Sequence, residues 1–96
     1  MVDYVREGDR ARARRAMERW LVVAPEDAPS LYAAALFYDE SGDLDRAVAL
    51  AVRARRAAPT SPALTAYEGA LRWRRGERAE AERLRRAADA MGPEPP

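Results

Sequence analysis

The sequence repeats itself with a period of 34 residues, and this period restricts the fold more than any other feature. Three kinds of residue keep the same phase along the chain: Gly8, Gly42 and Gly76; Pro25, Pro59 and Pro93; and Ala13, Ala47 and Ala81. Independent markers that share one period predict a stack of similar structural units rather than one irregular core.

Each repeat predicts two helices. In the middle repeat we expect the first helix over residues 28–40, with Asp27 as the N-cap and Pro29 in the first turn, where its missing N–H costs little. Apolar residues at positions i, i+3, i+4 and i+7 predict one buried face, formed by Leu31, Ala34, Ala35 and Tyr38. A second helix is expected through 47–54 and should end before Pro59.

Residues 38–45, Tyr-Asp-Glu-Ser-Gly-Asp-Leu-Asp, place four carboxylates around a glycine and raise the question of a metal site. A calcium loop of the EF-hand type needs glycine at its sixth position and glutamate at its twelfth. Counted from Asp39, Gly42 is the fourth residue and Leu50 the twelfth. The pattern predicts instead a helix that ends at a left-handed glycine, followed by carboxylates at the positive end of the next helix. We therefore expect a turn that binds no metal ion, and no other cofactor.

Residues 28–61, "APSLYAAALFYDESGDLDRAVALAVRARRAAPTS", resemble the tetratricopeptide repeat (TPR) family. The matching positions are Leu31, Ala34, Ala35, Tyr38, Gly42, Asp43, Ala47, Ala54 and Pro59, with Ala34-Ala35 in place of the usual Leu-Gly. The resemblance implies an all-α fold, an α-solenoid of antiparallel helix pairs with five full helices and a short N-terminal one. It covers two and two-thirds units, over 1–27, 28–61 and 62–91, and leaves 92–96 as a disordered tail.

The third unit is polar where the family has apolar residues, at Thr65, Glu68, Arg72 and Arg85. The last unit of a stack has no further neighbour, and its outer face must be polar. We interpret these residues as a C-terminal cap, in which Glu68 with Arg72 and Arg85 with Asp89 form i, i+4 pairs. The residues left to pack inward are Leu64, Tyr67, Leu71, Leu84, Ala87 and Met91.

The first unit is short, because only Val2–Glu7 precede Gly8. Trp20 is in phase with Ala54 and Ala88, and we expect its indole to fill the space left by the short helix. The alternative is an apolar edge formed by Trp20, Val22 and Val23 and covered by a second chain. A symmetric homodimer, or a structural subunit that self-associates through this edge, therefore stays open.

The resemblance also implies a concave groove, lined by the first helix of each unit, that binds a peptide or helix of a partner protein. Mapped onto this sequence, the groove residues are Val2, Val5, Arg6, Tyr32, Leu36, Asp39, Glu40, Ala66, Ala70, Trp73 and Arg74. Tyr and Trp suit such a role, since each buries a large area at low entropic cost. The alternative is that Tyr32, Leu36 and Trp73 only close contacts between units.

The chemistry of the groove limits the ligand. The TPR subclass that clamps a C-terminal carboxylate uses Lys and Asn, and neither type occurs in this chain. We expect an apolar or mixed segment as the ligand, with basic groups near Asp39 and Glu40.

The charge pattern favours a protein partner over nucleic acid. All 17 basic residues are Arg, and the runs at 10–15, 53–56, 72–78 and 83–86 could track phosphates. However, the net charge is only +1, acids alternate with these arginines at helical spacing, and residues 26–45 hold six acids and no Arg. An Arg-mediated binder of RNA or single-stranded DNA remains the weaker alternative.

Few features point to catalysis or to a membrane. The chain has neither Cys nor His, no phosphate-binding glycine motif, and no base to activate its serines. We therefore expect no enzymatic activity and no catalytic residue. No apolar run reaches the length of about 18 residues that a membrane span needs, and the first residues lack a signal peptide. We expect a cytoplasmic protein.

Overall fold

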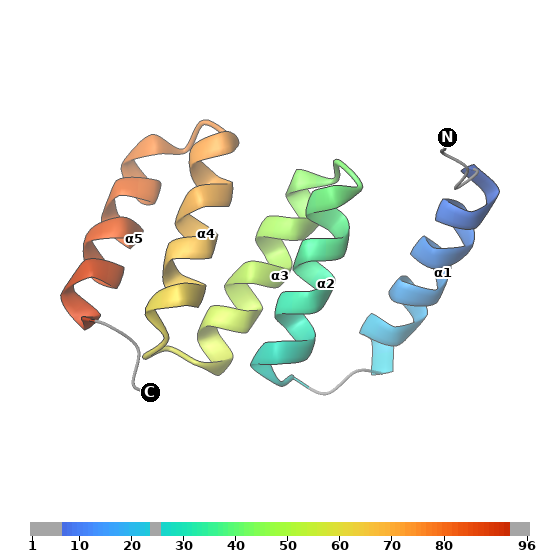
Figure 1. Ribbon diagram of the computed structural model, residues 1–96, viewed down its shortest axis with the longest axis horizontal. Helices are drawn as coiled ribbons and strands as arrows, with labels where there is room; N and C mark the ends of the chain where they lie inside the picture. The colour runs from blue at the N-terminus through green and yellow to red at the C-terminus, as the bar shows by residue number, and fades with distance from the viewer. Residues whose placement is uncertain (1–6, 24–25, 93–96) are drawn as a thin grey trace.

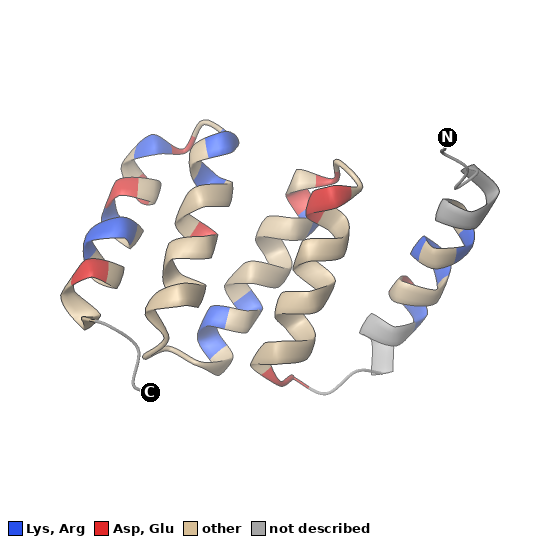
Figure 2. Ribbon diagram, viewed as in Figure 1, with Lys and Arg blue, Asp and Glu red and all other residues tan. Residues whose placement is uncertain are grey.

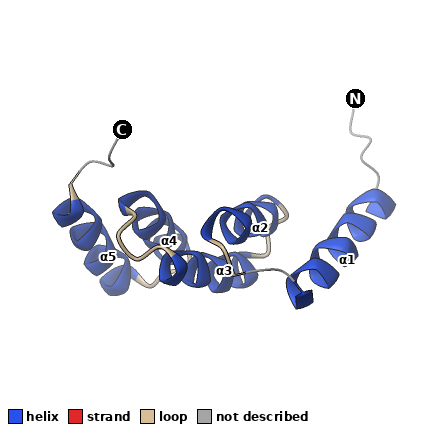
Figure 3. Cartoon of the chain, turned by 90° about the horizontal axis from the view of Figure 1, so that it is seen from below, coloured by secondary structure: helices blue, strands red, loops and turns tan. Residues whose placement is uncertain are grey.

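The protein is all-α throughout the part of the chain that the structure describes. The computed structural model describes residues 7–23 and 26–92, with side chains over 11–19 and 26–92. Five helices follow one another: α1 (Glu7–Val23), α2 (Ala28–Glu40), α3 (Leu44–Ala57), α4 (Pro62–Arg74) and α5 (Arg78–Met91) (Figure 1). Over these ranges there is no strand (Figure 3). The predicted helical class is confirmed.

Helices α2 and α3 form one antiparallel hairpin, and α4 and α5 form a second hairpin beside it (Figure 1). Helix α4 begins and ends 34 residues after α2, and α5 begins and ends 34 residues after α3. In the end view, α2 and α4 lie on one side and α3 on the other (Figure 3). The sequence period therefore sets the length and spacing of both hairpins.

Both hairpins begin with the same N-terminal cap. The Asp27 carboxylate accepts a hydrogen bond from the Ser30 backbone N–H at 3.0 Å, as predicted. At the equivalent position 34 residues later, the Ser61 hydroxyl accepts one from the backbone N–H of Leu64 at 3.2 Å. Each cap satisfies an N–H group that has no partner inside its helix.

The predicted turn at residues 38–45 is confirmed. Gly42 and Gly76 have φ angles of +86° and +90°, which side-chain-bearing residues rarely adopt. After Gly42, the backbone N–H of Asp43 donates to the carbonyl of Tyr38 at 2.9 Å, and the Asp43 carboxylate caps α3 by accepting from the Arg46 N–H at 3.1 Å. These carboxylates begin a helix, as expected.

Gly8 shares the phase of Gly42 and Gly76, which led us to expect a third turn there, but this expectation is wrong, because α1 begins at Glu7 and includes Gly8. The short helix expected before Gly8 falls on residues outside the described ranges, and so do residues 93–96 of the predicted tail.

The core lies within the α2–α3 hairpin and at its junction with α4. The predicted face of α2, Leu31, Ala34, Ala35 and Tyr38, is fully buried. It packs with Ala47, Val48, Leu50, Ala51, Ala54 and Leu71. Leu64 and Tyr67 of α4 cover this cluster from outside. Alanines make up half of the cluster, so the helices approach closely.

The interpretation of Thr65 and Glu68 as part of an exposed polar cap is wrong. Both are buried, with exposed fractions of 1% and 0%. They lie 34 residues after Leu31 and Ala34, so the repeat places them on the inward face of α4. Glu68 is held there by arginines, since Nε of Arg72 donates to its Oε2 at 2.7 Å and Arg55 of α3 binds its other oxygen.

The other residues of the predicted cap and of the predicted inward face differ in burial. Arg85 is exposed, and its Nη1 lies 3.6 Å from Oδ2 of Asp89, as the i, i+4 spacing predicts. Leu71 and Leu84 are buried, whereas Leu64, Tyr67 and Ala87 are half-buried. Met91 was expected to pack inward, but at the last position of α5 it is 38% exposed.

Candidate functional site

The structure separates the predicted groove residues into two groups. Val2, Val5 and Arg6 lie outside the described residues. Of the others, Tyr32 and Asp39 contact α4 directly: the Tyr32 and Tyr67 rings meet edge to face with centroids 5.0 Å apart, and Nη1 of Arg74 donates to Oδ1 of Asp39 at 2.8 Å. These contacts join the two hairpins to each other. The carboxylate expected to attract a basic ligand is already held by Arg74.

The Tyr67 hydroxyl lies at a half-buried position beside the Asp39 carboxylate. Burial, and then the negative charge of Asp39, raise the pKa of Tyr67 to about 12. The hydroxyl therefore stays protonated and can donate to Oδ2 of Asp39, 3.5 Å away. Leu36 is half-buried and Glu40 exposed on the same helix.

The remaining groove residues line an open pocket between α4 and α5. Ala66, Ala70, Trp73 and Arg74 share a volume of about 490 Å³ with Gly69, Ala81, Glu82 and Arg85. Trp73 is 47% exposed, and the guanidinium of Arg78 lies over its ring at 5.0 Å from the centroid. Small residues form the floor of this pocket, and an aromatic and two arginines stand at its rim.

The same surface occurs 34 residues earlier, where it is largely covered and only Tyr32 and Glu40 are exposed. There it consists of Tyr32, Ala35, Leu36, Asp39, Glu40, Ala47, Val48 and Ala51 of α2 and α3. Helix α4 packs on it through Leu64, Tyr67 and Leu71. The pocket between α4 and α5 is thus the uncovered version of a surface that receives a helix elsewhere in the same chain.

Sequence reasoning missed four residues of this pocket: Gly69, Ala81, Glu82 and Arg85. The 34-residue period could have identified them, because they lie 34 residues after Ala35, Ala47, Val48 and Ala51. Those four residues are buried in the core cluster.

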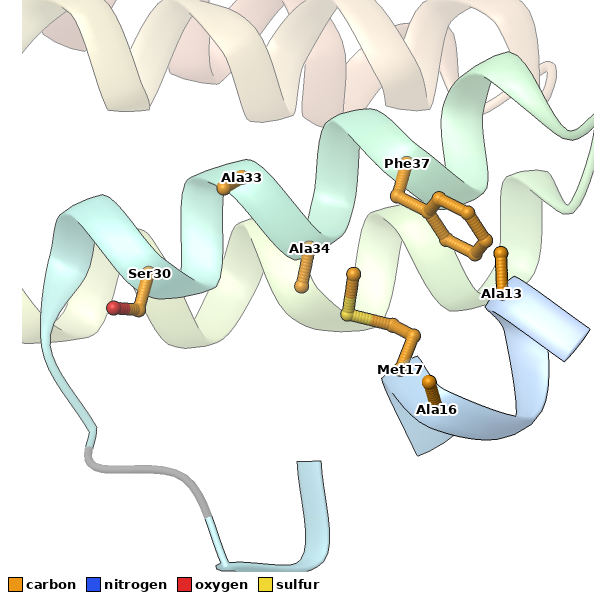
Figure 4. A pocket seen from close by; sticks show the side chains of 7 residues that line it. All are labelled: Ala13, Ala16, Met17, Ser30, Ala33, Ala34 and Phe37. Atoms are coloured by element: carbon orange, nitrogen blue, oxygen red, sulfur yellow. The ribbon is translucent and has the colours of Figure 1, made fainter. Parts of the chain in front are cut away.

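A second cleft of about 630 Å³ opens between α1 and α2 (Figure 4). Its lining is almost wholly apolar: Ala13, Ala16, Met17, Ser30, Ala33, Ala34 and Phe37. Met17 points across from α1 toward Ala34, and it is the described α1 side chain that packs against the core (Figure 4). Sequence reasoning did not identify this cleft. The predicted edge of Trp20, Val22 and Val23 lies on the same helix, but beyond the described side chains.

Acidic and basic residues gather at different turns. Acids surround the α2–α3 turn, whereas arginines predominate at the α4–α5 turn (Figure 2). The acids do not converge on one point: Asp39 binds Arg74, Asp43 binds Arg46, and Asp45 binds Arg75. Burial acts to raise the pKa of Asp43, but the hydrogen bonds and the positive charge of Arg46 together outweigh it and lower this pKa. Within the described side chains, no three acids group as a metal site would require.

Comparison with known proteins adds no relative. The sequence matches no protein-family model, and no curated protein matches it. Among the described helices, none combines the length and the apolar character needed to cross a lipid bilayer.

Proposed function

We propose that the protein is a TPR-like interaction module that binds a polypeptide segment, and that the segment lies in the pocket between α4 and α5. One observation carries the proposal: an exposed Trp73 stands in a pocket whose counterpart on α2 and α3 is filled by a helix. The 34-residue displacement of the helix bounds and the matching turns support a repeat of this family.

The pocket has the composition of a protein-binding hot spot. An indole that loses its exposed surface on binding contributes strongly to affinity, especially where small neighbours let a partner backbone approach. Gly69, Ala70 and Ala81 supply those small neighbours. The proposal includes no reaction and no cofactor, and it places the protein in the cytoplasm.

The arginines favour a protein ligand over nucleic acid. Among the described side chains, arginines that pair with an acid include Arg46, Arg53, Arg55, Arg72, Arg74, Arg75, Arg83 and Arg85. A guanidinium that is already neutralised locally contributes less to phosphate binding and counterion release.

A display library of helical and extended peptides, selected on the protein at low concentration, tests the proposal. Peptides that bind the wild type should bind at least about tenfold more weakly to Ala70→Arg, which fills the pocket. The matched control is Ala49→Arg, because Ala49 is an exposed alanine of α3 that lines neither cleft. Selected peptides that bind both variants equally would contradict the proposed site. RNA binding that weakens steeply with salt would favour the nucleic-acid alternative instead.

A further inference from the structure

The two clefts correspond to the two surfaces that meet where α4 packs on α2 and α3. The α2 residues Ser30, Ala33 and Phe37 lie 34 residues before Leu64, Tyr67 and Leu71, the face by which α4 docks on α2 and α3. They line the open cleft beside α1. The α4–α5 pocket is the counterpart of the surface that receives this docking face. One chain therefore presents a partly exposed docking face, flanked by α1, and an open receiving surface.

We propose that the polypeptide received by the α4–α5 pocket is helix α2 of a second copy of this chain. The inference rests on the proposed function and names the partner. Helix α2 of the second copy takes the place on α4 and α5 that α4 has on α2 and α3. In return, α5 of the first copy enters the cleft between α1 and α2 of the second.

The side chains at this contact are complementary in size. Inside the chain, the contact includes the rings of Tyr32 and Tyr67, which meet edge to face. Between copies, the equivalent residues are Ala66 and Ala33, both small and both exposed, so the helices can approach more closely. Phe37 takes the place of Leu71 and needs more room. The open pocket between α4 and α5, with a volume of about 490 Å³, supplies that room.

Charge also favours a second copy. In the internal junction, Arg74 of the docking helix binds Asp39 of the receiving surface at 2.8 Å. Between copies the signs are reversed: the docking helix carries the exposed Glu40 at that position. The receiving surface has Trp73 with the Arg78 guanidinium over its ring, next to Arg74. An acid from α2 thus meets the basic rim of the pocket.

The contact joins two different faces, so it does not close a symmetric dimer. Each copy in a pair keeps one free docking face and one free receiving surface, and further copies can add at both ends until a ring closes or a filament grows. This arrangement differs from a symmetric dimer through Trp20, Val22 and Val23, which would stop at two chains.

Two single substitutions, each on one face, test the inference by light scattering and sedimentation. Ala33→Arg blocks the docking face and Ala70→Arg blocks the receiving surface; both alanines are exposed helix residues, so the helices should remain intact. The wild-type mass should rise with concentration from about 1 µM to about 1 mM, the range of weak protein contacts. Each variant alone should stay at the mass of one chain, 10.7 kDa.

The decisive sample is an equimolar mixture of the two variants. Helix α2 of Ala70→Arg should dock on the intact pocket of Ala33→Arg, which gives a one-to-one dimer that cannot extend. Ala49→Arg should associate like the wild type. A wild type that stays monomeric over the whole range, a mixture that stays monomeric, or variants that associate as the wild type does would each overturn the inference.

The display experiment repeated on Ala33→Arg, whose pocket is intact and unoccupied by another copy, separates this inference from the proposed function. Peptides that bind this variant but not Ala33→Arg/Ala70→Arg would keep the proposed function, even if self-association fails. Failure of both experiments would remove both. Dimers that persist in each single variant would indicate the symmetric edge on α1 instead.

Discussion

Arg55 of α3 binds Glu68 of α4 across the junction of the two hairpins, and the Glu68 side chain is completely buried there. Arg72 binds the second carboxylate oxygen from one helical turn further along α4, with Nε at 2.7 Å from Oε2. Burial acts to lower the pKa of Arg72, but hydrogen bonds to Glu68 and Glu77 outweigh it and raise this pKa. A buried acid thus holds two arginines from two hairpins together.

Replacing Glu68 with alanine should destabilise the fold by about 3 kcal/mol, because it removes the acid that binds the partly buried Arg55 and leaves the partly buried Arg72 with Glu77 alone. Urea unfolding followed by circular dichroism measures this change. Glu82→Ala is the control, since Glu82 pairs with the exposed Arg85 at the surface and should change stability by less than about 1 kcal/mol. Equal effects of the two substitutions would mean that the buried pair adds nothing to the junction.

Substituting alanine for Gly42 or Gly76 should cost about 1 kcal/mol each, because both have positive φ angles that alanine adopts only with strain. No neighbouring atom would clash with the new methyl group, so backbone strain alone sets the cost. Gly8→Ala should have the opposite sign, since Gly8 lies inside α1 and alanine favours a helix. Thermal unfolding of the three variants checks this contrast, and a destabilised Gly8→Ala would contradict the helix start at Glu7.

Tyr38→Phe should leave the protein equally stable or stabilise it by up to about 1 kcal/mol. Its hydroxyl is buried and finds no hydrogen-bond partner among the described residues. Removing it therefore removes the cost of burying an unsatisfied polar group. Tyr67→Phe should instead destabilise by about 1 kcal/mol, since the Tyr67 hydroxyl donates to Asp39. Chemical unfolding at neutral pH measures both, and only Tyr67→Phe is expected to lower the free energy of unfolding.

The protein should lose stability as the pH rises from 10 toward 12. The folded pKa of Tyr67, about 12, lies above its ordinary value of 10.0, so its contribution is complete below pH 10 and is lost as the pH rises to the folded value. The chain contains no Lys and no Cys, which leaves the tyrosines as the side chains that titrate in this range. Tyr67→Phe should therefore lose less stability than the wild type over these two pH units, as urea unfolding at each pH would record. Parallel losses in the two proteins would contradict the assignment.

The hairpins could be predicted from sequence because local signals agree with one another. Asp27 caps α2, Gly42 ends it, and Leu31 and Tyr38 mark the face that the core buries. Each of these signals acts within one helix or one turn. The 34-residue repeat then predicts the bounds of α4 and α5 from those of α2 and α3.

The junction could not be predicted in the same way, because its partners are distant in sequence. A glutamate at position 68 suggests a solvated surface, and only the fold reveals that Arg55, 13 residues earlier, meets it inside. The α4–α5 pocket was missed for a different reason. Gly69 and Ala81 are too small to stand out by themselves, and they become informative only in register with the buried Ala35 and Ala47.

The equal spacing of the two hairpins has a consequence for how such a protein can grow. Helices α4 and α5 repeat the bounds of α2 and α3 residue for residue. A duplicated segment 28–61 could therefore be inserted between the two hairpins, because each of its ends would meet a hairpin with the same bounds. The packing inside one hairpin therefore does not limit how many hairpins a chain can contain. The limit is set at the first and last hairpins, whose outer surfaces must be covered.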